Sequence, residues 1–192
     1  IYDKVFNLIG YPLDDEYRSV KMINHLLEYF GKEVGVEITK LDVVQVPLPE
    51  KIVKGKYVTI HATAGWSDYK NWPIKRWEQV VKAFPEIKFY QIGTIDNPKI
   101  TGVDHSFMGA DLSVSIALFA NATLHLGVDS FTNHLTHFIW GTRMVPAIIL
   151  WGSTQMSAAG YYHNTNISMN LECQPCFREN SNISTARTDV CP

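Results

Sequence analysis

Between residues 57 and 151 the chain alternates short runs of β-branched and aromatic residues with longer segments in which apolar residues recur at helical spacing. The pattern predicts strands at 57–61, 88–93, 124–128 and 145–151, and helices at 73–84, 111–122 and 131–140. Strands that alternate with helices of this length are typical of a parallel sheet covered by helices on both faces. The predicted fold class is therefore α/β, with a Rossmann-like sheet.

Single residues mark the ends of these helices. Pro73 suits the first turn of its helix, and Asp111 is a candidate N-cap for the next one. Gly141 follows the helix at 131–140 and is expected to end it.

The first 50 residues have a different pattern. They predict a strand at 3–9 and an amphipathic helix at 16–31, which Gly31 ends. The stretch "VVQVPLPEKIVKGK" follows, with two prolines and three lysines, as is typical of a linker. We therefore expect a boundary between a short N-terminal strand–helix piece, residues 1–50, and a main domain, residues 51–192.

Composition excludes some classes of function. The formal net charge of −2 argues against a basic nucleic-acid-binding surface, so we expect no nucleic-acid partner. No apolar run reaches the roughly 18–20 residues that span a bilayer. The opening "IYDKVFNLIG" lacks the basic start and cleavage site of a signal peptide. We expect a cytoplasmic protein, and the missing initiator Met indicates a fragment or a trimmed chain.

Polar or glycine-bearing loops follow all four predicted strands of the main domain, at 61–72, 93–98, 129–134 and 151–155. Because the carboxyl ends of parallel strands meet at one edge of a sheet, these loops are expected to converge. Ligands of open α/β sheets bind at that edge.

The loop "VDSFTNH" predicts an anion site at a helix N-terminus. Asp129 or Ser130 can cap the helix, and the free N–H groups and helix dipole favour an anion such as phosphate, held by Ser130 Oγ. Asp129 would repel phosphate and is better suited to accept hydrogen bonds from a sugar hydroxyl. A plain N-cap without a ligand remains the alternative, and His134 alone is more often a structural histidine.

The other loops add a cation and a carboxylate. Lys70 would neutralise charge that builds up on a diphosphate leaving group, with Thr63 in the same loop. Asp96 could bind ribose hydroxyls, as acidic residues do in nucleotide folds. The structural alternatives are a solvated surface lysine and a turn aspartate before Asn-Pro.

Three blocks of sequence together carry a family resemblance: "HATAGWSDYKNWPIKRW", "DLSVSIALFANATLHLGVDSFTNHLTHF" and "VPAIILWGSTQ". In this order and spacing they resemble the C-terminal half of a family-nine glycosyltransferase, the group that includes the ADP-heptose:lipopolysaccharide heptosyltransferases. The resemblance covers residues 57–192. It implies a GT-B enzyme, in which two Rossmann-like domains face a cleft and the C-terminal one holds the nucleotide-sugar donor.

The resemblance also implies roles for single residues, which fall into a diphosphate group, a sugar group and a nucleoside group. The diphosphate residues are Thr63, Lys70 and Ser130, with His134 supporting the turn. Asp129 would meet the sugar, while Asp96 would lie near the ribose and Met108 or its neighbours would line the base pocket. Phe131 stands where the family signature has glycine, so its N–H remains available but its side chain must point away.

The implied reaction is an inverting displacement without a metal, since the sequence has no Asp-x-Asp clamp. Lys70 and the helix at Ser130 would stabilise the leaving nucleoside diphosphate, with Asp129 beside the sugar. The implied donor is ADP-heptose or a similar nucleotide-diphosphate sugar. The acceptor would be a lipopolysaccharide-type glycan, a lipid-linked glycan or a protein, which allows peripheral contact with the inner membrane.

Residues 1–50 would be a remnant of the N-terminal acceptor domain, which would hold the general base. The fragment alone is therefore expected to be inactive. The alternative is a non-catalytic nucleotide-sugar-binding module. A dinucleotide oxidoreductase is disfavoured, because no G-x-G-x-x-G follows the first strand.

The cysteines form a C-x₂-C-x₁₄-C pattern near the end of the chain. Cys173 and Cys176 make a knuckle suited to a tetrahedral metal site, with Cys191 as a third ligand. We expect no cofactor for catalysis, and the knuckle predicts a structural zinc or iron at this cluster. Three free thiols or a Cys173–Cys176 disulfide are the alternatives.

Overall fold

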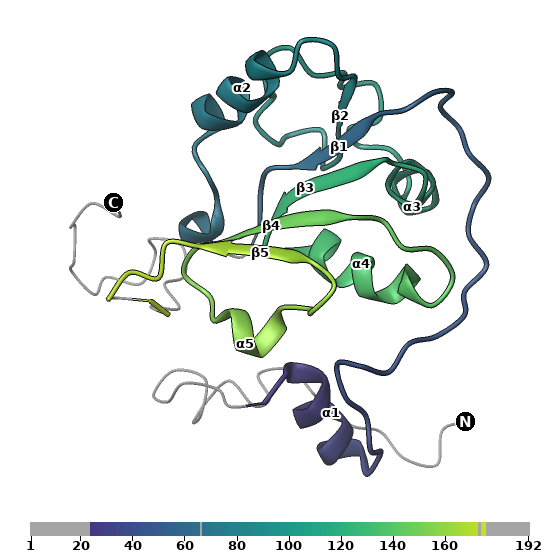
Figure 1. Ribbon diagram of the computed structural model, residues 1–192, viewed down its shortest axis with the longest axis vertical. Helices are drawn as coiled ribbons and strands as arrows, with labels where there is room; N and C mark the ends of the chain where they lie inside the picture. The colour runs from purple at the N-terminus through teal and green to yellow at the C-terminus, as the bar shows by residue number, and fades with distance from the viewer. Residues whose placement is uncertain (1–23, 66, 173, 176–192) are drawn as a thin grey trace.

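The computed structural model describes residues 24–65, 67–172 and 174–175, and these residues build one five-stranded, all-parallel sheet (Figure 1). The strand order is β2-β1-β3-β4-β5. The strands are β1 (Val58–His61), β2 (Phe89–Gln91), β3 (Leu124–Val128), β4 (Ala147–Trp151) and β5 (Thr165–Ser168). The predicted α/β fold class is confirmed.

Helices connect the strands much as the apolar periodicity predicts. They are α2 (Ile74–Ala83), α3 (Leu112–Ala120), α4 (Phe131–Trp140) and the short α5 (Met156–Ala159), with a 3₁₀ turn, η2, at Asp68–Lys70. Pro73 is the N-cap of α2 rather than part of its first turn, and Asp111 occupies the N-cap of α3 without a side-chain hydrogen bond. The sequence did not predict η2, α5 or β5.

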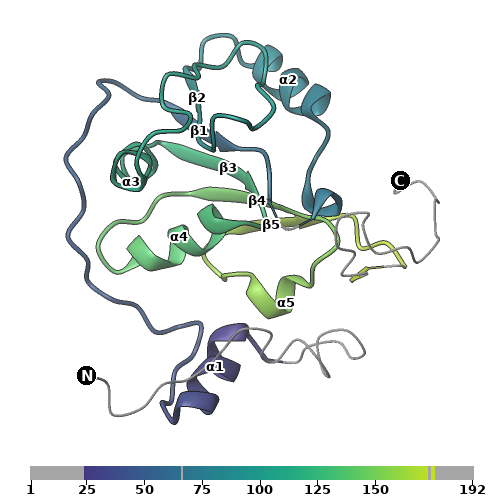
Figure 2. The ribbon, with the colours of Figure 1, turned by 180° about the vertical axis from the view of Figure 1, so that it is seen from behind.

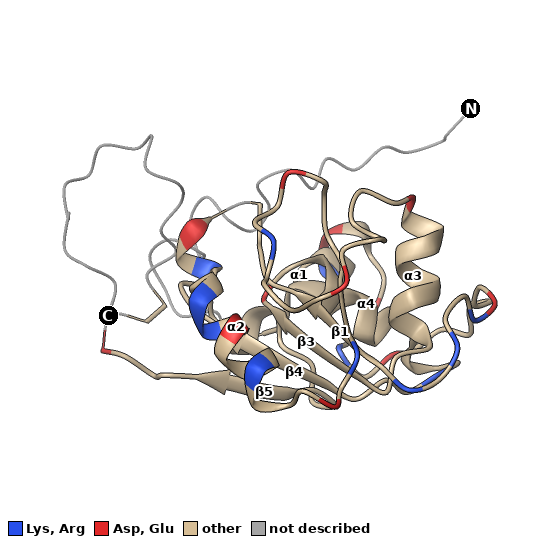
Figure 3. Cartoon of the chain, turned by 90° about the horizontal axis from the view of Figure 1, so that it is seen from above, with Lys and Arg blue, Asp and Glu red and all other residues tan. Residues whose placement is uncertain are grey.

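The alternation of side chains along the strands builds two cores, one on each face of the sheet. Ile60, Leu126 and Val128 pack against Trp77 of α2 on one face. The other face packs against α3 and α4, whose buried members include Leu118, Phe119, Leu135 and Ile139. Figures 1 and 2 show α2 on one side of the strands and α3 and α4 on the other, and Figure 3 shows the same layers from above.

The N-terminal helix differs from the prediction. Helix α1 spans Leu26–Val34 and continues through Gly31, which is wrong as its predicted end. Gly31 is buried, and a Cβ there would lie 2.2 Å from Ile38 Cγ2, so close packing explains the glycine. Gly35 ends the helix instead, in the left-handed conformation with φ 75°.

A long connection without helix or strand then leads from α1 to β1 along the edge of the domain (Figure 1). Val46 is tied to Thr142 by two hydrogen bonds of 2.8 and 2.9 Å, so this predicted linker packs on the domain at that point. The predicted strand at 3–9 and the first half of the helix predicted at 16–31 lie outside the described residues. Among the described residues, no helix combines the length and apolar character needed to cross a membrane.

Candidate functional site

Three of the four loops that the sequence predicted to converge, at 61–72, 129–134 and 151–155, meet at the carboxyl edge of the sheet. The Lys70 ammonium at the end of η2 lies 2.7 Å from Asp129 Oδ2, directly after β3. The Thr154 hydroxyl, after β4, donates to the same carboxylate oxygen at 2.5 Å. The backbone N–H of Ser153 donates to the Tyr69 carbonyl at 3.1 Å, so three loops are held together.

This meeting point is the topological switch point of the fold. From β1 the chain continues to β2 on one side of the sheet, and from β3 it continues to β4 and β5 on the other. In open α/β sheets such a divergence opens a crevice at the carboxyl ends of the two central strands. His61 ends β1 and Ser130 follows β3, so both lie at that crevice.

Asp129 and Lys70 form a nearly buried ion pair. Their side chains keep only 4% and 12% of their exposure. A carboxylate withdrawn from water this far needs partners, and the ammonium and the Thr154 hydroxyl supply them. The pair therefore fixes the Lys70 cation beside the start of α4, rather than leaving it as a solvated surface lysine.

The N-terminus of α4 is not closed by its own N-cap. Ser130 occupies the N-cap with extended backbone and makes no side-chain capping hydrogen bond. The expectation that Asp129 or Ser130 caps this helix is wrong, since the Asp129 carboxylate binds Lys70 and Ser130 Oγ lies 2.8 Å from His61 Nδ1. The first N–H groups of α4, which have no intrahelical partner, therefore stay available to a ligand.

His61 is a residue of this site that the sequence reasoning missed. Burial lowers the pKa of His61 to about 4, so the ring is neutral at physiological pH. Its Nδ1 faces Ser130 Oγ and also lies 3.4 Å from Thr132 Oγ1. A signal was available, because alternation from the core residue Ile60 places His61 on the face of the sheet that α4 covers.

His134 lies one turn into α4. Its Nδ1 lies 3.0 Å from the Tyr161 hydroxyl in a part-buried contact, so it contacts the segment before β5 rather than its own turn. Desolvation lowers the pKa of His134, and the nearby Asp129 carboxylate opposes that shift. These contacts are those of a structural histidine beside the site.

The remaining predicted residues are placed as follows. Phe131 is 46% exposed at the start of α4, so its side chain points away from the core. Thr63 is half-buried in the loop after β1. Asp96 is exposed after β2 and Met108 is buried, and in the described part of the chain neither is joined to the Lys70–Asp129 pair by a hydrogen bond or ion pair.

The cysteine cluster lies outside the described residues, since Cys173, Cys176 and Cys191 are not among them. Within residues 24–65, 67–172 and 174–175, no three His, Cys, Asp or Glu side chains gather as a metal site would require.

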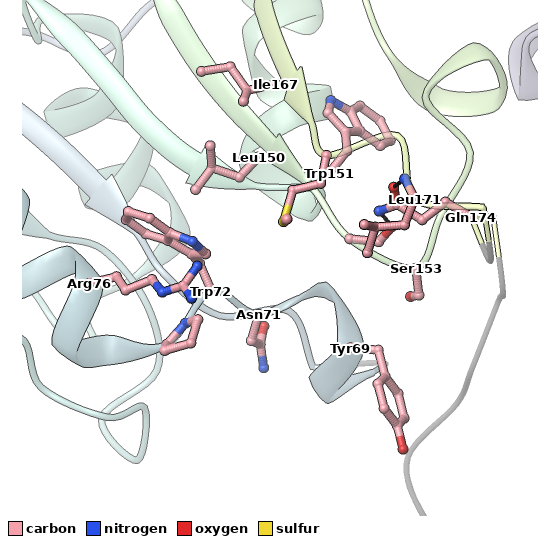
Figure 4. A pocket seen from close by; sticks show the side chains of 13 residues that line it. Tyr69, Asn71, Trp72, Arg76, Leu150, Trp151, Ser153, Ile167, Leu171 and Gln174 are labelled. Carbon is pink, nitrogen blue, oxygen red and sulfur yellow. Dashed lines mark hydrogen bonds between the residues drawn. The ribbon is translucent and has the colours of Figure 1, made fainter. Parts of the chain in front are cut away.

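A pocket of about 440 Å³ lies next to the charged cluster, on the side of η2 and the ends of β4 and β5 (Figure 4). The apolar and aromatic walls include Trp72, Leu150 and Ile167. The Arg76 side chain lies beside Trp72. Tyr69 and Ser153 belong both to this pocket and to the contact that joins the loops. The volume falls in the range of small-molecule sites.

Comparison with solved structures gives the same fold. A bacterial iron-containing dodecameric glycosyltransferase, TibC from enterotoxigenic E. coli, aligns over 78% of this chain with a TM-score of 0.64 and 19% identity. The E. coli heptosyltransferase WaaC, solved with ADP, aligns over 73% with a TM-score of 0.52 and 19% identity. A family 9 glycosyl transferase from Veillonella parvula aligns over 78% with a TM-score of 0.54 and 15% identity.

These alignments cover 40% of TibC, 48% of WaaC and 49% of the Veillonella protein, so the chain spans about half or less of each. No family model and no curated protein matches the sequence. At such identities the likeness is one of fold, and it agrees with the fold that the sequence resemblance implied.

Proposed function

We propose that this chain is the donor-binding domain of an inverting GT-B glycosyltransferase of the heptosyltransferase kind. One observation carries the proposal: an uncapped helix N-terminus, a fixed lysine and a carboxylate meet at the switch point of a parallel sheet. A nucleoside diphosphate needs hydrogen-bond donors and a cation for its phosphates. A sugar hydroxyl needs an acceptor, which Asp129 provides.

Each side chain has a role in this proposal. The N–H groups at the start of α4 and the Ser130 hydroxyl bind the diphosphate, with Lys70 and Thr63 on its other side. Asp129 orients the sugar. Asp96 lies towards the ribose, and the region of Met108 borders the base.

In the proposed reaction an acceptor hydroxyl loses its proton to a general base from a second, N-terminal domain. The oxygen attacks the anomeric carbon while the bond to the diphosphate oxygen breaks, which inverts the configuration. The negative charge on the departing diphosphate is stabilised by Lys70 and the N-terminus of α4. The groups assigned above, in the part of the chain that the structure describes, all serve the donor side of that scheme, and we propose that these 192 residues do not transfer sugar by themselves.

The solved structures suggest candidates for the ligands. The E. coli TibC heptosyltransferase was solved with ADP-D-β-D-heptose, and WaaC with ADP. We propose ADP-heptose or a similar donor here, and a lipopolysaccharide-type glycan, a lipid-linked glycan or a protein as acceptor. A cytoplasmic enzyme with peripheral contact to the inner membrane fits those acceptors.

A thermal-shift screen with ADP-, GDP- and UDP-sugars tests the donor site. A bound donor at about 100 times its dissociation constant adds about 2.7 kcal/mol to the free energy of unfolding. The shift should shrink in Ser130→Ala. It should persist in the matched control Ser113→Ala, an exposed serine in the first turn of α3. A panel without any shift contradicts the proposal, and binding without transfer by a chain with both domains favours a non-catalytic module.

A structural metal at Cys173, Cys176 and Cys191 remains part of the proposal, since TibC is described as iron-containing. Elemental analysis of the reduced protein tests it. Zinc or iron near one equivalent, lost in Cys173→Ser, supports the site, and a metal-free protein rejects it.

A further inference from the structure

The contact between His61 and Ser130 raises a question of direction. Ser130 Oγ lies 2.8 Å from His61 Nδ1, within hydrogen-bond distance, and either atom can be the donor. A serine hydroxyl has a single proton. If it donates to His61, only lone pairs remain for a ligand, and these repel an anionic oxygen. If it accepts from His61, its proton is free to point at the ligand.

The charge state of His61 makes this choice binary. Burial holds the pKa of His61 at about 4, so above that pH the ring carries one N–H, on either Nδ1 or Nε2. Thr132 Oγ1 lies 3.4 Å from the same Nδ1, so two hydroxyl oxygens face one ring nitrogen. When the ring donates from Nδ1 to Ser130 Oγ, the Ser130 hydroxyl proton is not used in this contact and can point elsewhere.

The surroundings hold the imidazole in this position. His61 pairs in register with Gly127 of β3, which carries no side chain. A Cβ at Gly127 would lie 3.3 Å from Thr132 Oγ1 and 2.7 Å from His125 Nε2, so any larger residue would press on this group of side chains. Glycine at 127 therefore leaves the space in which His61, Ser130 and Thr132 meet.

We propose that His61 is a positioning residue whose Nδ1–H donates to Ser130 Oγ and thereby directs the Ser130 hydroxyl proton towards an anionic ligand oxygen. The inference rests on the proposed function, because it assigns a device to the same diphosphate site. His61 itself does not touch the ligand. It acts by making Ser130 a donor instead of an acceptor.

The first test needs no variant. Nitrogen NMR of the wild-type protein labelled at histidine distinguishes a protonated from an unprotonated ring nitrogen. The inference predicts a proton on Nδ1 of His61 at pH 7, assigned by comparison with His61→Asn. An unprotonated Nδ1 overturns it, whatever the protein binds.

The second test is a double-mutant cycle on nucleoside diphosphate binding, with ADP, GDP and UDP as probes. Loss of a charge-assisted hydrogen bond weakens binding by about tenfold or more, which is expected for both Ser130→Ala and His61→Ala. In the double variant the losses should not add, because His61 acts only through Ser130. His61→Asn, whose amide N–H can replace Nδ1–H, should recover most of the affinity.

The outcomes separate the two claims. If the wild-type protein binds none of the probes, the proposed function fails and the positioning role fails with it. If it binds but the two losses add, or Asn is as poor as Ala at position 61 while both variants remain folded, the proposed function stands and the role of His61 is overturned.

Discussion

The two ends of helix α4 differ in how their polar side chains are paired. At its N-terminus, Asp129 is paired with Lys70 and Thr154, and Ser130 with His61. Beyond its first turn, aromatic and imidazole rings stack. The ring centroids of His137 and Tyr161 lie 4.3 Å apart with an interplanar angle of 8°, and those of Trp140 and His163 lie 3.9 Å apart with an angle of 19°. The first, paired region therefore contains a fixed ion pair, whereas the second, stacked region consists of neutral rings.

The stacked region leaves ring nitrogens without partners. Among the described residues these are His137 Nδ1, His163 Nδ1 and Nε2 of His25, whose ring centroid lies 5.0 Å from that of Tyr161; all three atoms are buried. Burial is the largest cause that lowers the pKa of each, to about 4 for His25 and His163. Neutral rings stack here at no electrostatic cost, whereas protonation places a charge where burial opposes it; the Ala159 backbone at His25 and Asp42 at His137 offset this cost only in part. The comparison predicts that the paired region loses stability when a partner is removed, and that the stacked region loses stability when the pH falls.

The largest effect is expected from Asp129→Ala. It removes the carboxylate from a nearly buried ion pair, and breaking such a pair typically costs about 3–5 kcal/mol of unfolding free energy. Denaturant unfolding measures the loss. The double variant Lys70→Met, Asp129→Leu should recover much of it, because both charges of the pair are then removed together. A loss below about 1 kcal/mol for Asp129→Ala would show that the pair is solvated, contrary to this account.

Acid should destabilise the protein through the stacked region. The folded-state pKa of His25 is lowered from 6.5 to about 4, so the unfolded chain binds more protons than the folded one between these values. Stability is therefore full above pH 6.5 and falls as the pH drops towards 4, by roughly 3 kcal/mol for that one imidazole. Melting temperatures measured from pH 7 to 4 follow this loss.

The variant His163→Phe refines the pH experiment. It keeps a ring against Trp140 and removes one titrating group, so the acid loss should become shallower. An unchanged pH dependence would mean that this cluster does not set the acid limit of stability.

A smaller effect is expected within the paired region from Thr154→Val. The variant keeps the shape of a 6% exposed side chain and removes the hydroxyl that donates to Asp129, at a cost of about 1.5–3 kcal/mol. Thr165→Val, at an exposed position of β5, is the control and should stay within about 0.5 kcal/mol of wild type. Equal stability losses at both positions would show that the Thr154 hydroxyl does not stabilise the Asp129 carboxylate.

The smallest effect concerns ligand approach. Phe131→Gly should strengthen nucleoside diphosphate binding a few-fold, since a glycine lets phosphate come closer to the backbone. Phe138→Gly, on the same helix and 50% exposed against 46% for Phe131, lies inside the helix, where glycine costs more stability than at the first position, and should leave binding unchanged. Calorimetric titration of the two variants compares them directly, and a matching change in both would assign the effect to the helix alone.

Sequence periodicity predicted the part of the fold that has strong periodicity. Strand β3 and helix α4 were predicted at their observed bounds, because both present buried apolar faces. Strand β5 was missed, since Thr165–Ser168 is polar and half-exposed at the edge of the sheet. The predicted end of α1 was wrong, because Gly31 allows close packing against Ile38 and does not terminate the helix.

The convergence of the site followed from strand order, but its pairings did not. Lys70 and Asp129 are 59 positions apart, and only the register of β1 against β3 and the turn η2 brings them within 2.7 Å. The His61–Ser130 contact depends on the same register, so the sequence could name Ser130 but not its partner. The stacking of His137 and Tyr161 joins α4 to a segment that had no predicted structure at all.

The most direct test of the central claim, a diphosphate site at the start of α4, is backbone amide NMR during titration with a nucleoside diphosphate. The account predicts that the largest shifts occur at residues 130–132 and 63–70, with little change at 161–163. Shifts confined to 161–163, or no shift at saturating ligand, would contradict it.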